Sequence, residues 1–422
     1  MGRIHDRLVV IGQGYVGLPV AVRAAEVGFD VVGFEVDERK VKLLNAASSY
    51  VEDITDERLA ALVDAGSYRA SSDPSDLEGF DVAVISVPTP MGEGVPDLTY
   101  IEAASATVAP FITPGATVIL ESTTYPGTTE ELAGPILAKG SGLRPGEDFH
   151  LGYSPERIDP GNATWRLENT PKVVSGVDAA SLEKVTAFFD RLVDRTVPVS
   201  GTREAEMTKL LENTFRHVNI ALVNELAMFA NALGIDVWES IDAASTKPFG
   251  YMRFTPGPGV GGHCLPIDPS YLSWKVERVL GQTFRFVELA NDVNEHMPDY
   301  VVRRIQGMLN DRSRAVKGST ILVYGLAYKA NTGDARETPS RPVVEKLIEL
   351  GAEVLVADPH VDDHQMPPGA RRVDGTAREA ATADLVAYLV DHDAFDTDGI
   401  EALETPVLDC RHALKGPRVE YL

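Results

Sequence analysis

The stretch LVVIGQGYVGLPVAVRAAEVGFDVVGFEVD, residues 8–37, decides the fold of this chain. An apolar run at 8–12 enters a glycine-rich turn, a helical segment ends at Gly28, and a second apolar run covers 30–37. Short apolar runs that alternate with helices across such turns are typical of a parallel sheet covered by helices. We therefore expect an α/β protein. Further apolar runs predict buried strands at 81–88, 116–123 and 149–156.

The turn in this stretch has the spacing GxGxxG, formed by Gly12, Gly14 and Gly17. Glycines at these positions permit a tight turn and the close approach of a pyrophosphate, which the N-terminus of the next helix attracts. Glu35 ends the following strand, where a carboxylate accepts hydrogen bonds from ribose hydroxyls and repels a 2′-phosphate. The pattern predicts NAD rather than NADP, although the basic pair at 39–40 leaves NADP open. The alternative is a turn that only packs tightly.

The same order of strand, glycine turn, helix and strand occurs again in the C-terminal part of the chain. A strand pattern at 319–329 enters a glycine turn, a helix is predicted at 341–351, and a strand at 352–360 contains Asp358. Between the two occurrences, residues 203–233 lack Gly and Pro and have apolar residues at a helical period, which predicts a helix of roughly 45 Å. We expect two Rossmann-like doubly wound domains joined by this long central helix and a small helical domain. The expected domains are 1–200, 201–310 and 311–422.

Composition narrows the class of partner. The 422 residues carry a formal net charge of −24, and such a surface repels phosphate backbones and anionic membranes. We expect no nucleic-acid partner, whereas a small anionic ligand still fits a locally basic pocket. No apolar run reaches about 18 residues, so neither a membrane span nor a secretory signal is expected. Two cysteines cannot form a disulfide framework, and a reducing, cytoplasmic setting is expected.

Cys264 lies in GPGVGGHCLPID, residues 257–268. A lone cysteine is usually a small buried apolar residue. The flanking glycines favour another interpretation, because they remove side-chain obstruction, allow positive φ and leave backbone N–H groups able to hold an anion. Asp268 adds a carboxylate, and Lys209, if near, would lower the thiol pKa. A thiolate beside a nicotinamide suits the oxidation of an aldehyde to an acid through a thioester, with the thiolate as nucleophile and the nicotinamide as hydride acceptor. His263 has no partner at metal-ligand spacing, and no metal site is expected.

The long helix has polar residues on one side. Lys209, Asn213 and Arg216 follow one another at spacings of four and three, which places them on one helical face. They line a cleft on one interpretation and form a solvated stripe on the other.

A series of segments resembles the nucleotide-sugar 6-dehydrogenases, which include UDP-glucose and GDP-mannose dehydrogenases. The segments are GQGYVGLP, SVPTP followed by DLTYI, ESTTYPGTT, GYSPERIDPGN, EAEMTKLLENTFRHVNIALVNEL, GPGVGGHCLPID and GLAYKANTGDARETPS, in the family's order over nearly the whole chain. The resemblance implies oxidation of a sugar C6 alcohol to a carboxylate in two steps, with two NAD. It also implies an NAD-binding domain, a central dimerisation domain and a UDP-sugar-binding domain, in that order.

The resemblance implies a covalent mechanism. Cys264 would capture the aldehyde as a thiohemiacetal, and its oxidation would give a thioester that water hydrolyses. Lys209 and Asn213 would stabilise the oxyanion at C6. Asp268 would position or deprotonate the water together with Thr123.

The resemblance also implies the binding residues, and it makes Glu156 an acid/base in the thioester steps. The implied NAD-binding residues are Gly12, Gly14, Tyr15, Val16, Gly17, Glu35, Arg39, Pro88, Thr89, Thr123, Glu156 and Arg336. The implied sugar-nucleotide residues are Arg157, Lys209, Asn213, Arg216, Phe254, Gly257, Gly261 and Lys329. Lys329 would meet the substrate diphosphate and Arg336 the NAD pyrophosphate.

Substrate choice depends on the segments SPERIDPGN, TPKVVSG and GPGVGGHCLPIDPSYLSWK, which resemble the branch that oxidises UDP-N-acetylhexosamines. UDP-N-acetylglucosamine is placed first, UDP-N-acetylmannosamine next, and UDP-glucose behind them. The family implies a homodimer or a higher homo-oligomer. Two other hypotheses stay open: a single-step hydroxyacid dehydrogenase that lacks the cysteine, and a sugar-nucleotide sensor that has lost catalysis.

Overall fold

The computed structural model describes residues 6–51, 53–92, 94–158, 162, 164–262, 265 and 267–422. The chain divides into two compact units. The first unit ends at Glu212 and includes Arg278–Leu280, and the second comprises Asn213–Glu277 and Gly281–Leu422. Cys264 and His263 lie outside the described residues. The expected domain boundaries at 200 and 310 stay a prediction.

The described strands of the first unit form one main sheet in the order β10-β9-β8-β7-β4-β1-β2-β3. Its strands are β1 (Arg7–Ile11), β2 (Asp30–Phe34), β3 (Tyr68–Ser71), β4 (Val82–Ile85), β7 (Thr117–Leu120), β8 (His150–Tyr153), β9 (Lys172–Gly176) and β10 (Thr196–Pro198). Neighbouring strands are parallel except for β8 and β9, which are antiparallel. The strand order reverses at β1, and in such sheets ligands bind beyond the carboxyl ends of the strands at this point.

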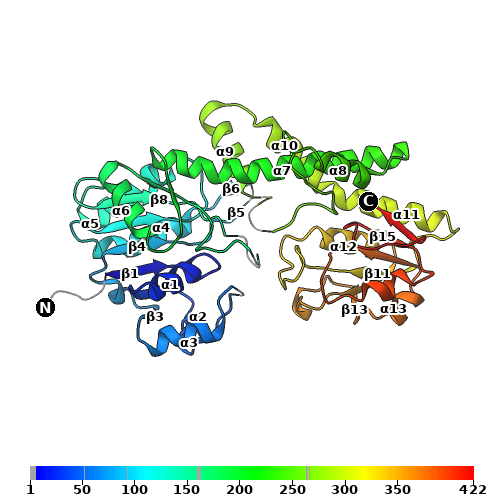
Figure 1. Cartoon of the computed structure of the whole chain (residues 1–422), viewed down its shortest axis with the longest axis horizontal. Coiled ribbons are helices and arrows are strands. Elements are labelled where there is room, and N and C mark those ends of the chain that lie inside the picture. Colours follow the sequence, from blue (N-terminus) through cyan, green and yellow to red (C-terminus); the bar gives the residue numbers. More distant parts are fainter. Residues whose placement is uncertain are drawn as a thin grey trace. The chain divides into compact units, whose positions relative to one another are not determined.

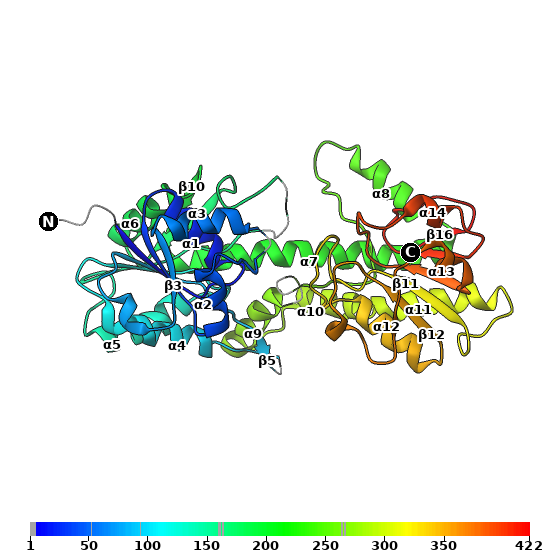
Figure 2. The same cartoon turned by 90° about the horizontal axis from the view of Figure 1, so that it is seen from below.

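Helices cover both faces of this sheet. Side chains alternate along β1, so neighbouring apolar residues are buried on opposite faces. Leu8 and Val10 pack with α1 (Gly17–Glu26), α3 (Asp56–Asp64) and α6 (Ala179–Phe189). Val9 and Ile11 pack with α4 (Thr99–Val108) and α5 (Gly134–Ser141) on the other face. Figure 2 shows α1 and α6 on the side of the sheet opposite α4 and α5. A strand buried on both faces reads as a continuous apolar run, which is why this region was recognisable in the sequence.

The long helix is present as α7 (Thr202–Leu233), 32 residues without a break (Figure 1). Residues 268–310 form three consecutive helices: α9 (Asp268–Leu280), α10 (Arg285–Glu295) and α11 (Met297–Asn310). Gly281 ends α9 in the left-handed conformation, with φ of 62°. Pro298 lies in the first turn of α11, where a missing N–H costs nothing, and it cannot continue α10.

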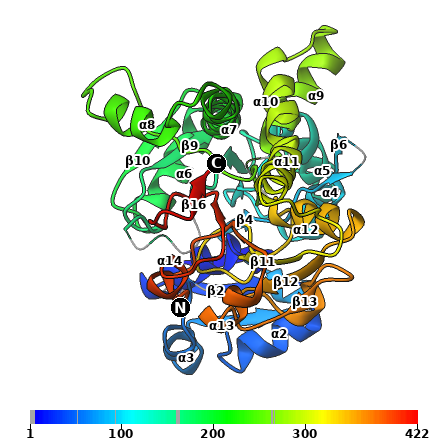
Figure 3. The same ribbon diagram turned by 90° about the vertical axis from the view of Figure 1, so that its right-hand side faces the viewer.

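The described strands of the second unit form a parallel sheet in the order β13-β12-β11-β14-β15-β16. They are β11 (Thr320–Tyr324), β12 (Glu353–Ala357), β13 (Arg371–Arg372), β14 (Leu385–Tyr388), β15 (Val407–Asp409) and β16 (Val419–Tyr421). Helices α11 and α12 (Ser340–Glu349) cover one face, and α13 (Ala377–Thr382) and α14 (Thr397–Glu401) cover the other (Figure 3). Cys410 is fully buried in this core, and burial raises the pKa of its thiol. The second doubly wound unit is confirmed.

In the part of the chain that the structure describes, no helix combines the length and the apolar character needed to cross a membrane.

Candidate active site

The three glycines of the first turn have three different tasks. Gly12 has φ of +89°, and a Cβ there would lie 2.5 Å from the carbonyl oxygen of Ser86. A Cβ on Gly17 would lie 1.9 Å from the carbonyl oxygen of Gly12, so this glycine lets α1 pack closely on β1. A Cβ on Gly14 would meet no atom within 4 Å. The turn therefore leaves open space at Gly14, beside the N-terminus of α1, as the approach of a pyrophosphate requires.

Glu35 follows β2 and is held beside this turn. Its Oε2 accepts a hydrogen bond from the backbone N–H of Gln13 at 3.2 Å, and its Oε1 accepts one from the N–H of Asp37 at 3.1 Å. Arg39 is largely exposed and bonds to Asp37 at 2.9 Å, and hydrogen bonds from Arg39 lower the pKa of Asp37 to about 2. Arg39, one of the two cations that could have bound the 2′-phosphate of NADP, is thus paired with an acid. The residues around the turn therefore fit NAD.

Replacing Glu35 by serine should shift cofactor preference toward NADP. The serine removes the charge that repels a 2′-phosphate, so the ratio of kcat/KM for NAD to that for NADP should fall at least about tenfold. Steady-state kinetics with both cofactors measures the ratio. Glu38→Ser, at the exposed start of α2 (Glu38–Asn45), is the matched control and should leave the ratio unchanged. An unchanged ratio in Glu35→Ser would mean that the ribose does not lie beside Glu35.

Gln13, inside the glycine motif, supports the turn structurally, a role that the sequence did not reveal. Its side chain is fully buried and donates to the carbonyl oxygen of Val10 at 2.9 Å. The hydroxyl of Tyr68 donates to its Oε1 at 2.9 Å, and that of Tyr50 donates to its backbone oxygen at 2.6 Å. These contacts fix the glycine turn from beneath. The signal was a long amide between two glycines of a turn, but its partners lie far along the chain.

Five other predicted cofactor residues lie in the glycine turn or follow neighbouring parallel strands of the first sheet. Tyr15 and Val16 belong to the glycine turn itself. Pro88 and Thr89 come after β4, and Thr123 comes after β7. Because the carboxyl ends of β1, β4 and β7 meet at one edge of the sheet, the structure brings these residues to the same edge.

Glu156 and Lys209 form a buried pair at this edge. Glu156 follows β8, and the Nζ of Lys209 in α7 donates to its backbone oxygen at 2.7 Å and to its Oε2 at 3.1 Å. The N–H of Ile158 donates to the other carboxylate oxygen. The pair places an ammonium and a carboxylate, both shielded from solvent, at the edge where doubly wound sheets bind ligands.

Two further contacts attach α7 to this edge. Arg157, a predicted substrate residue, pairs with Glu212 and donates to the carbonyl oxygen of Pro171 at 2.6 Å. Glu206, which the sequence did not single out, accepts hydrogen bonds from the N–H of Gly127 at 2.6 Å and from the N–H of Thr129 at 2.9 Å. Burial raises the pKa of Glu206 to about 7. These bonds fix the first turns of α7 on either side of Lys209.

In the second unit, Asn213 and Asp268 lie in contact. The Nδ2 of Asn213 donates to Oδ2 of Asp268, the first residue of α9, and both side chains are buried. Arg216 is exposed on α7, and Phe254 packs edge-on against Phe215 at a centroid distance of 5.7 Å. The predicted amide and carboxylate are therefore neighbours.

The glycines before Cys264 have a packing role. A Cβ on Gly261 would lie 2.8 Å from the carbonyl oxygen of Glu337 and 2.8 Å from Cδ of Pro339, and one on Gly259 would lie 2.8 Å from Cβ of Pro339. The space beside these glycines is filled by the chain's own residues. Close packing is a further physical reason for glycine in this loop, and the substrate-binding role of Gly257 and Gly261 stays a prediction. The packing holds the loop against the segment that contains Arg336.

Gly261→Ala should destabilise this packing. The added Cβ would overlap a backbone oxygen, and overpacking of this kind costs about 1–3 kcal/mol in the free energy of unfolding. Denaturant unfolding measures the loss. Gly307→Ala is the matched control, because a Cβ at that helical position of α11 meets nothing within 4 Å. Equal stability of the two variants would show that the loop does not pack as described.

A chain of amides anchors the same loop. The N–H of Gly257 donates to Oδ1 of Asn224 at 2.9 Å, and Nδ2 of Asn224 donates to Oδ1 of Asn294 at 2.9 Å. His217 contacts Asn291 through Nε2 at 2.7 Å, and burial lowers its pKa, which favours the neutral ring. These residues are spread over α7 and α10. Sequence reasoning missed them because each is unremarkable on its own helix.

The loop after β11 carries Lys329 and is held at both ends. Oδ2 of Asp358 accepts hydrogen bonds from the N–H groups of Leu326 at 2.7 Å and Ala327 at 2.9 Å. The N–H of Asn331 donates to Nδ1 of His392 at 2.9 Å, so the other ring nitrogen donates to Asp358, at 3.1 Å. Arg336 pairs with Asp334. The predicted diphosphate residue thus lies on a fixed loop at the carboxyl edge of the second sheet.

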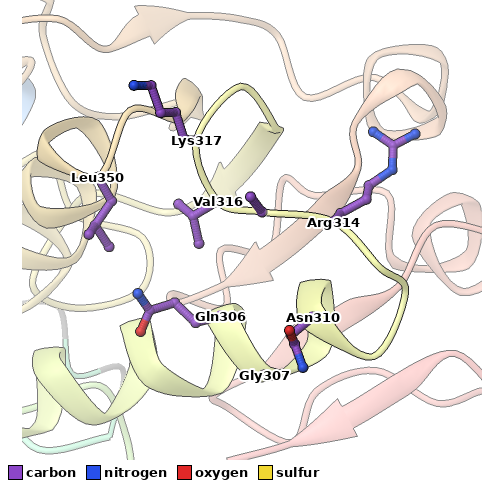
Figure 4. A pocket seen from close by; sticks show the side chains of 8 residues that line it. Gln306, Gly307, Asn310, Arg314, Val316, Lys317 and Leu350 are labelled. Carbon is purple, nitrogen blue, oxygen red and sulfur yellow. The ribbon is translucent and has the colours of Figure 1, made fainter.

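Figure 4 shows an open hollow elsewhere in the second unit. Among its lining residues are Arg314 and Lys317, just before β11. It therefore lies at the amino end of the sheet, opposite the edge where α/β proteins bind ligands. Its position argues against a substrate site.

A glycine turn with an acid at the end of the next strand, in a doubly wound sheet followed by a second one, defines a dinucleotide-dependent enzyme with a further ligand-binding unit. The chain belongs to the UDP-glucose/GDP-mannose dehydrogenase family. Its NAD binding domain model matches residues 6–193, its central domain model 203–296 and its UDP binding domain model 322–416. The protein is an oxidoreductase, an NAD-dependent nucleotide-sugar dehydrogenase. The predicted fold class, cofactor and enzyme class are confirmed.

Three relatives cover nearly the whole chain. UDP-N-acetyl-D-mannosamine dehydrogenase of Pyrococcus horikoshii is 34% identical, over 99% of this chain and 98% of the relative. The solved structure of the P. horikoshii UDP-D-ManNAc dehydrogenase matches with a TM-score of 0.89 at 34% identity, over 99% of this chain and 98% of that chain. Protein CapL of Staphylococcus aureus is 38% identical, over 92% and 90%. NDP-N-acetyl-D-galactosaminuronic acid dehydrogenase of Ralstonia nicotianae is 35% identical, over 97% and 96%.

Proposed function

We propose that this enzyme oxidises the C6 hydroxyl of a UDP-N-acetylhexosamine to the carboxylate in two steps, with two NAD per sugar. The observation that carries the proposal is the buried Lys209–Glu156 pair at the carboxyl edge of the dinucleotide-binding sheet. An ammonium in such a position stabilises negative charge on a reacting oxygen, and a carboxylate beside it transfers a proton. An alcohol oxidation needs both.

Each residue has a defined task in the proposed reaction. NAD, when bound, accepts a hydride from C6 in each oxidation. Lys209 and Asn213 stabilise the charge on the C6 oxygen. The thiolate of Cys264 attacks the aldehyde and forms a thiohemiacetal, and its oxidation leaves a thioester. Asp268 and Thr123 orient the water that hydrolyses the thioester, which releases the carboxylate and restores the thiol.

Glu156 and the remaining groups complete the scheme. Glu156 exchanges the proton that the C6 oxygen gains and loses. Lys329 and Arg336 supply the cations that diphosphates require in a protein of net negative charge. We place the enzyme in the cytoplasm, since the thiol of Cys264 must stay reduced.

The names of two relatives bear on which sugar nucleotide is the substrate. The P. horikoshii relative is named for UDP-N-acetyl-D-mannosamine, and the R. nicotianae relative for an N-acetyl-D-galactosaminuronic acid. Both names contain an N-acetylated hexose unit, which supports a UDP-N-acetylhexosamine as substrate. The sequence motifs place UDP-N-acetylglucosamine first, and the relatives' names move UDP-N-acetylmannosamine beside it.

A panel of nucleotide sugars tests the proposal. UDP-N-acetylglucosamine, UDP-N-acetylmannosamine, UDP-N-acetylgalactosamine, UDP-glucose and GDP-mannose are each assayed by NADH absorbance. We expect two NADH per sugar from one of the N-acetylhexosamines. A preference for UDP-glucose of more than about tenfold, roughly 1.4 kcal/mol in transition-state discrimination, would overturn the substrate class. One NADH per sugar would favour a single-step dehydrogenase, and tight binding without NADH a sensor.

We also propose a homodimer, because α7 exposes apolar side chains. Leu222, Leu226, Phe229 and Leu233, spaced by four, three and four residues, are between 47% and 72% exposed. An apolar stripe of this kind on a helix marks a protein interface. Leu226→Lys/Phe229→Lys should convert the dimer to a monomer in sedimentation velocity. A wild-type chain that sediments as a monomer at micromolar concentration would exclude the dimer.

A further inference from the structure

Lys172 and Glu121 form an ion pair buried inside the first unit. Glu121 follows β7 and Lys172 begins β9, and their side chains are 0% and 3% exposed. The ammonium of Lys172 also lies 5.1 Å from the centroid of the Phe189 ring. Neither Lys172 nor Glu121 belongs to the predicted catalytic or binding residues.

Lys172 contacts the segment that carries Glu156. Its Nζ donates to the carbonyl oxygen of Pro155 at 3.1 Å, and Nζ of Lys209 donates to the next carbonyl oxygen, that of Glu156, at 2.7 Å. Two ammonium groups therefore hold two successive peptide oxygens. A third contact joins the same two segments: Nη1 of Arg157 donates to the carbonyl oxygen of Pro171, the residue before Lys172. Residues 155–157 are fixed from the sheet and from α7.

The two buried pairs also interact electrostatically. Burial raises the pKa of Glu121, and its neighbour Lys172 acts in the opposite direction. The charges of Glu156 and Lys209 act on Glu121 as well. Oε2 of Glu121 is buried and has no hydrogen-bond partner among the described residues. Two ammonium and two carboxylate groups thus form one charge cluster at the edge of the sheet.

Stability alone does not account for the Lys172–Glu121 pair. Desolvating two charges costs several kcal/mol per ion, and an apolar pair of similar volume is often as stable or more stable. The orphaned Oε2 of Glu121 adds to the cost. What an apolar pair would not supply is the hydrogen bond to the Pro155 oxygen. The position of the peptide before Glu156 is therefore the property that this pair maintains.

We propose that Lys172 and Glu121 are positioning residues for the dehydrogenase reaction: Lys172, oriented by Glu121, fixes the Pro155–Glu156 peptide and thereby keeps the Glu156 carboxylate on Lys209. The proposal rests on the proposed function, in which Glu156 and Lys209 act on the C6 oxygen. Misplacement of a reacting group by about 1 Å can cost 10²-fold in rate. The effect should fall on kcat, because neither side chain is expected to touch sugar or cofactor.

The test compares Lys172→Met with the double variant Glu121→Leu/Lys172→Met. Lys172→Met leaves a buried carboxylate without its counterion, so both the melting temperature and kcat should fall. The double variant removes both charges and should recover the melting temperature, whereas its kcat should stay about 10²-fold low, with KM for NAD and for the UDP-sugar within about threefold of wild type. The acidic limb of the kcat–pH profile should also move, because Glu156 loses its fixed position. Arg58→Met, which breaks a partly buried pair with Glu26 in the same unit, is the control and should keep the wild-type kcat and profile.

The outcomes separate this proposal from the proposed function. A double variant that regains both melting temperature and kcat would show that the pair is only structural. So would a loss of activity in Lys172→Met that merely follows its unfolded fraction. If Glu156→Gln is fully active in the same assays, the role given to Glu156 fails first. Wild-type protein that forms no NADH with any sugar of the panel would remove the proposed function itself.

Discussion

Replacing Cys264 by alanine is expected to abolish formation of the uronic acid. Without the thiol, the C6 aldehyde has no protein nucleophile with which to form the tetrahedral adduct that the second oxidation requires. Acid formation should fall at least about 10³-fold, as for other covalent nucleophiles. The yield of NADH should drop from two per sugar to one or fewer. Mass spectrometry of the sugar product, together with NADH stoichiometry, measures both changes.

Cys410→Ala provides the matched control for this substitution. It removes the chain's other cysteine, which is buried in the core of the second unit and has a raised thiol pKa. The control should lose some stability and still form two NADH per sugar. If Cys264→Ala also formed two NADH per sugar, the thioester mechanism would be wrong, and direct oxidation of a hydrated aldehyde would replace it.

Lys209→Met should reduce kcat by about 10²–10³-fold, the loss that follows when one oxyanion donor is removed from an enzyme. The long apolar side chain keeps the volume of Lys209 and removes its charge. It also leaves the Glu156 carboxylate without the ammonium that binds it at 3.1 Å. KM for NAD should change little, because Lys209 lies on α7 and not in the glycine turn. Steady-state kinetics with the best sugar of the panel measures the split.

Lys184→Met serves as its control, since Lys184 is exposed on α6. The control should retain wild-type kcat and KM. A Lys209→Met enzyme with full kcat and a raised KM for the sugar would show that the ammonium binds substrate and transition state equally.

Much of the fold was predictable because it depends on local pattern. The turn at Gly12, the acid at Glu35 and the helix over 203–233 each follow from residues close together in the sequence, and each is present. The strand β9 was not assigned, because five residues are too short a pattern to distinguish a strand, and only the folded sheet shows its antiparallel pairing with β8.

The parts of the candidate site that were missed depend on distant pairing. Lys172 meets Glu121 across 51 positions, and Asn224 meets Asn294 across 70. A lysine at the start of a strand and an asparagine in a helix are ordinary residues, and only the sheet order or the packing of α7 with α10 gives them partners. Glu156 and Lys209, 53 positions apart, were found because the family resemblance marked both.

Because Cys410 is buried, its reaction with a thiol reagent reports how often the core of the second unit opens. A thiol reagent reaches this residue only after the core of the second unit opens, so the rate of its slow modification measures how often that core opens. Any thiol that reacts quickly in native protein must then be at position 264, because the chain has two cysteines. In Cys264→Ala protein, only the slow modification of Cys410 should be observed. A UDP-sugar that binds the folded second unit should slow it further, which reports binding by an enzyme that completes no turnover.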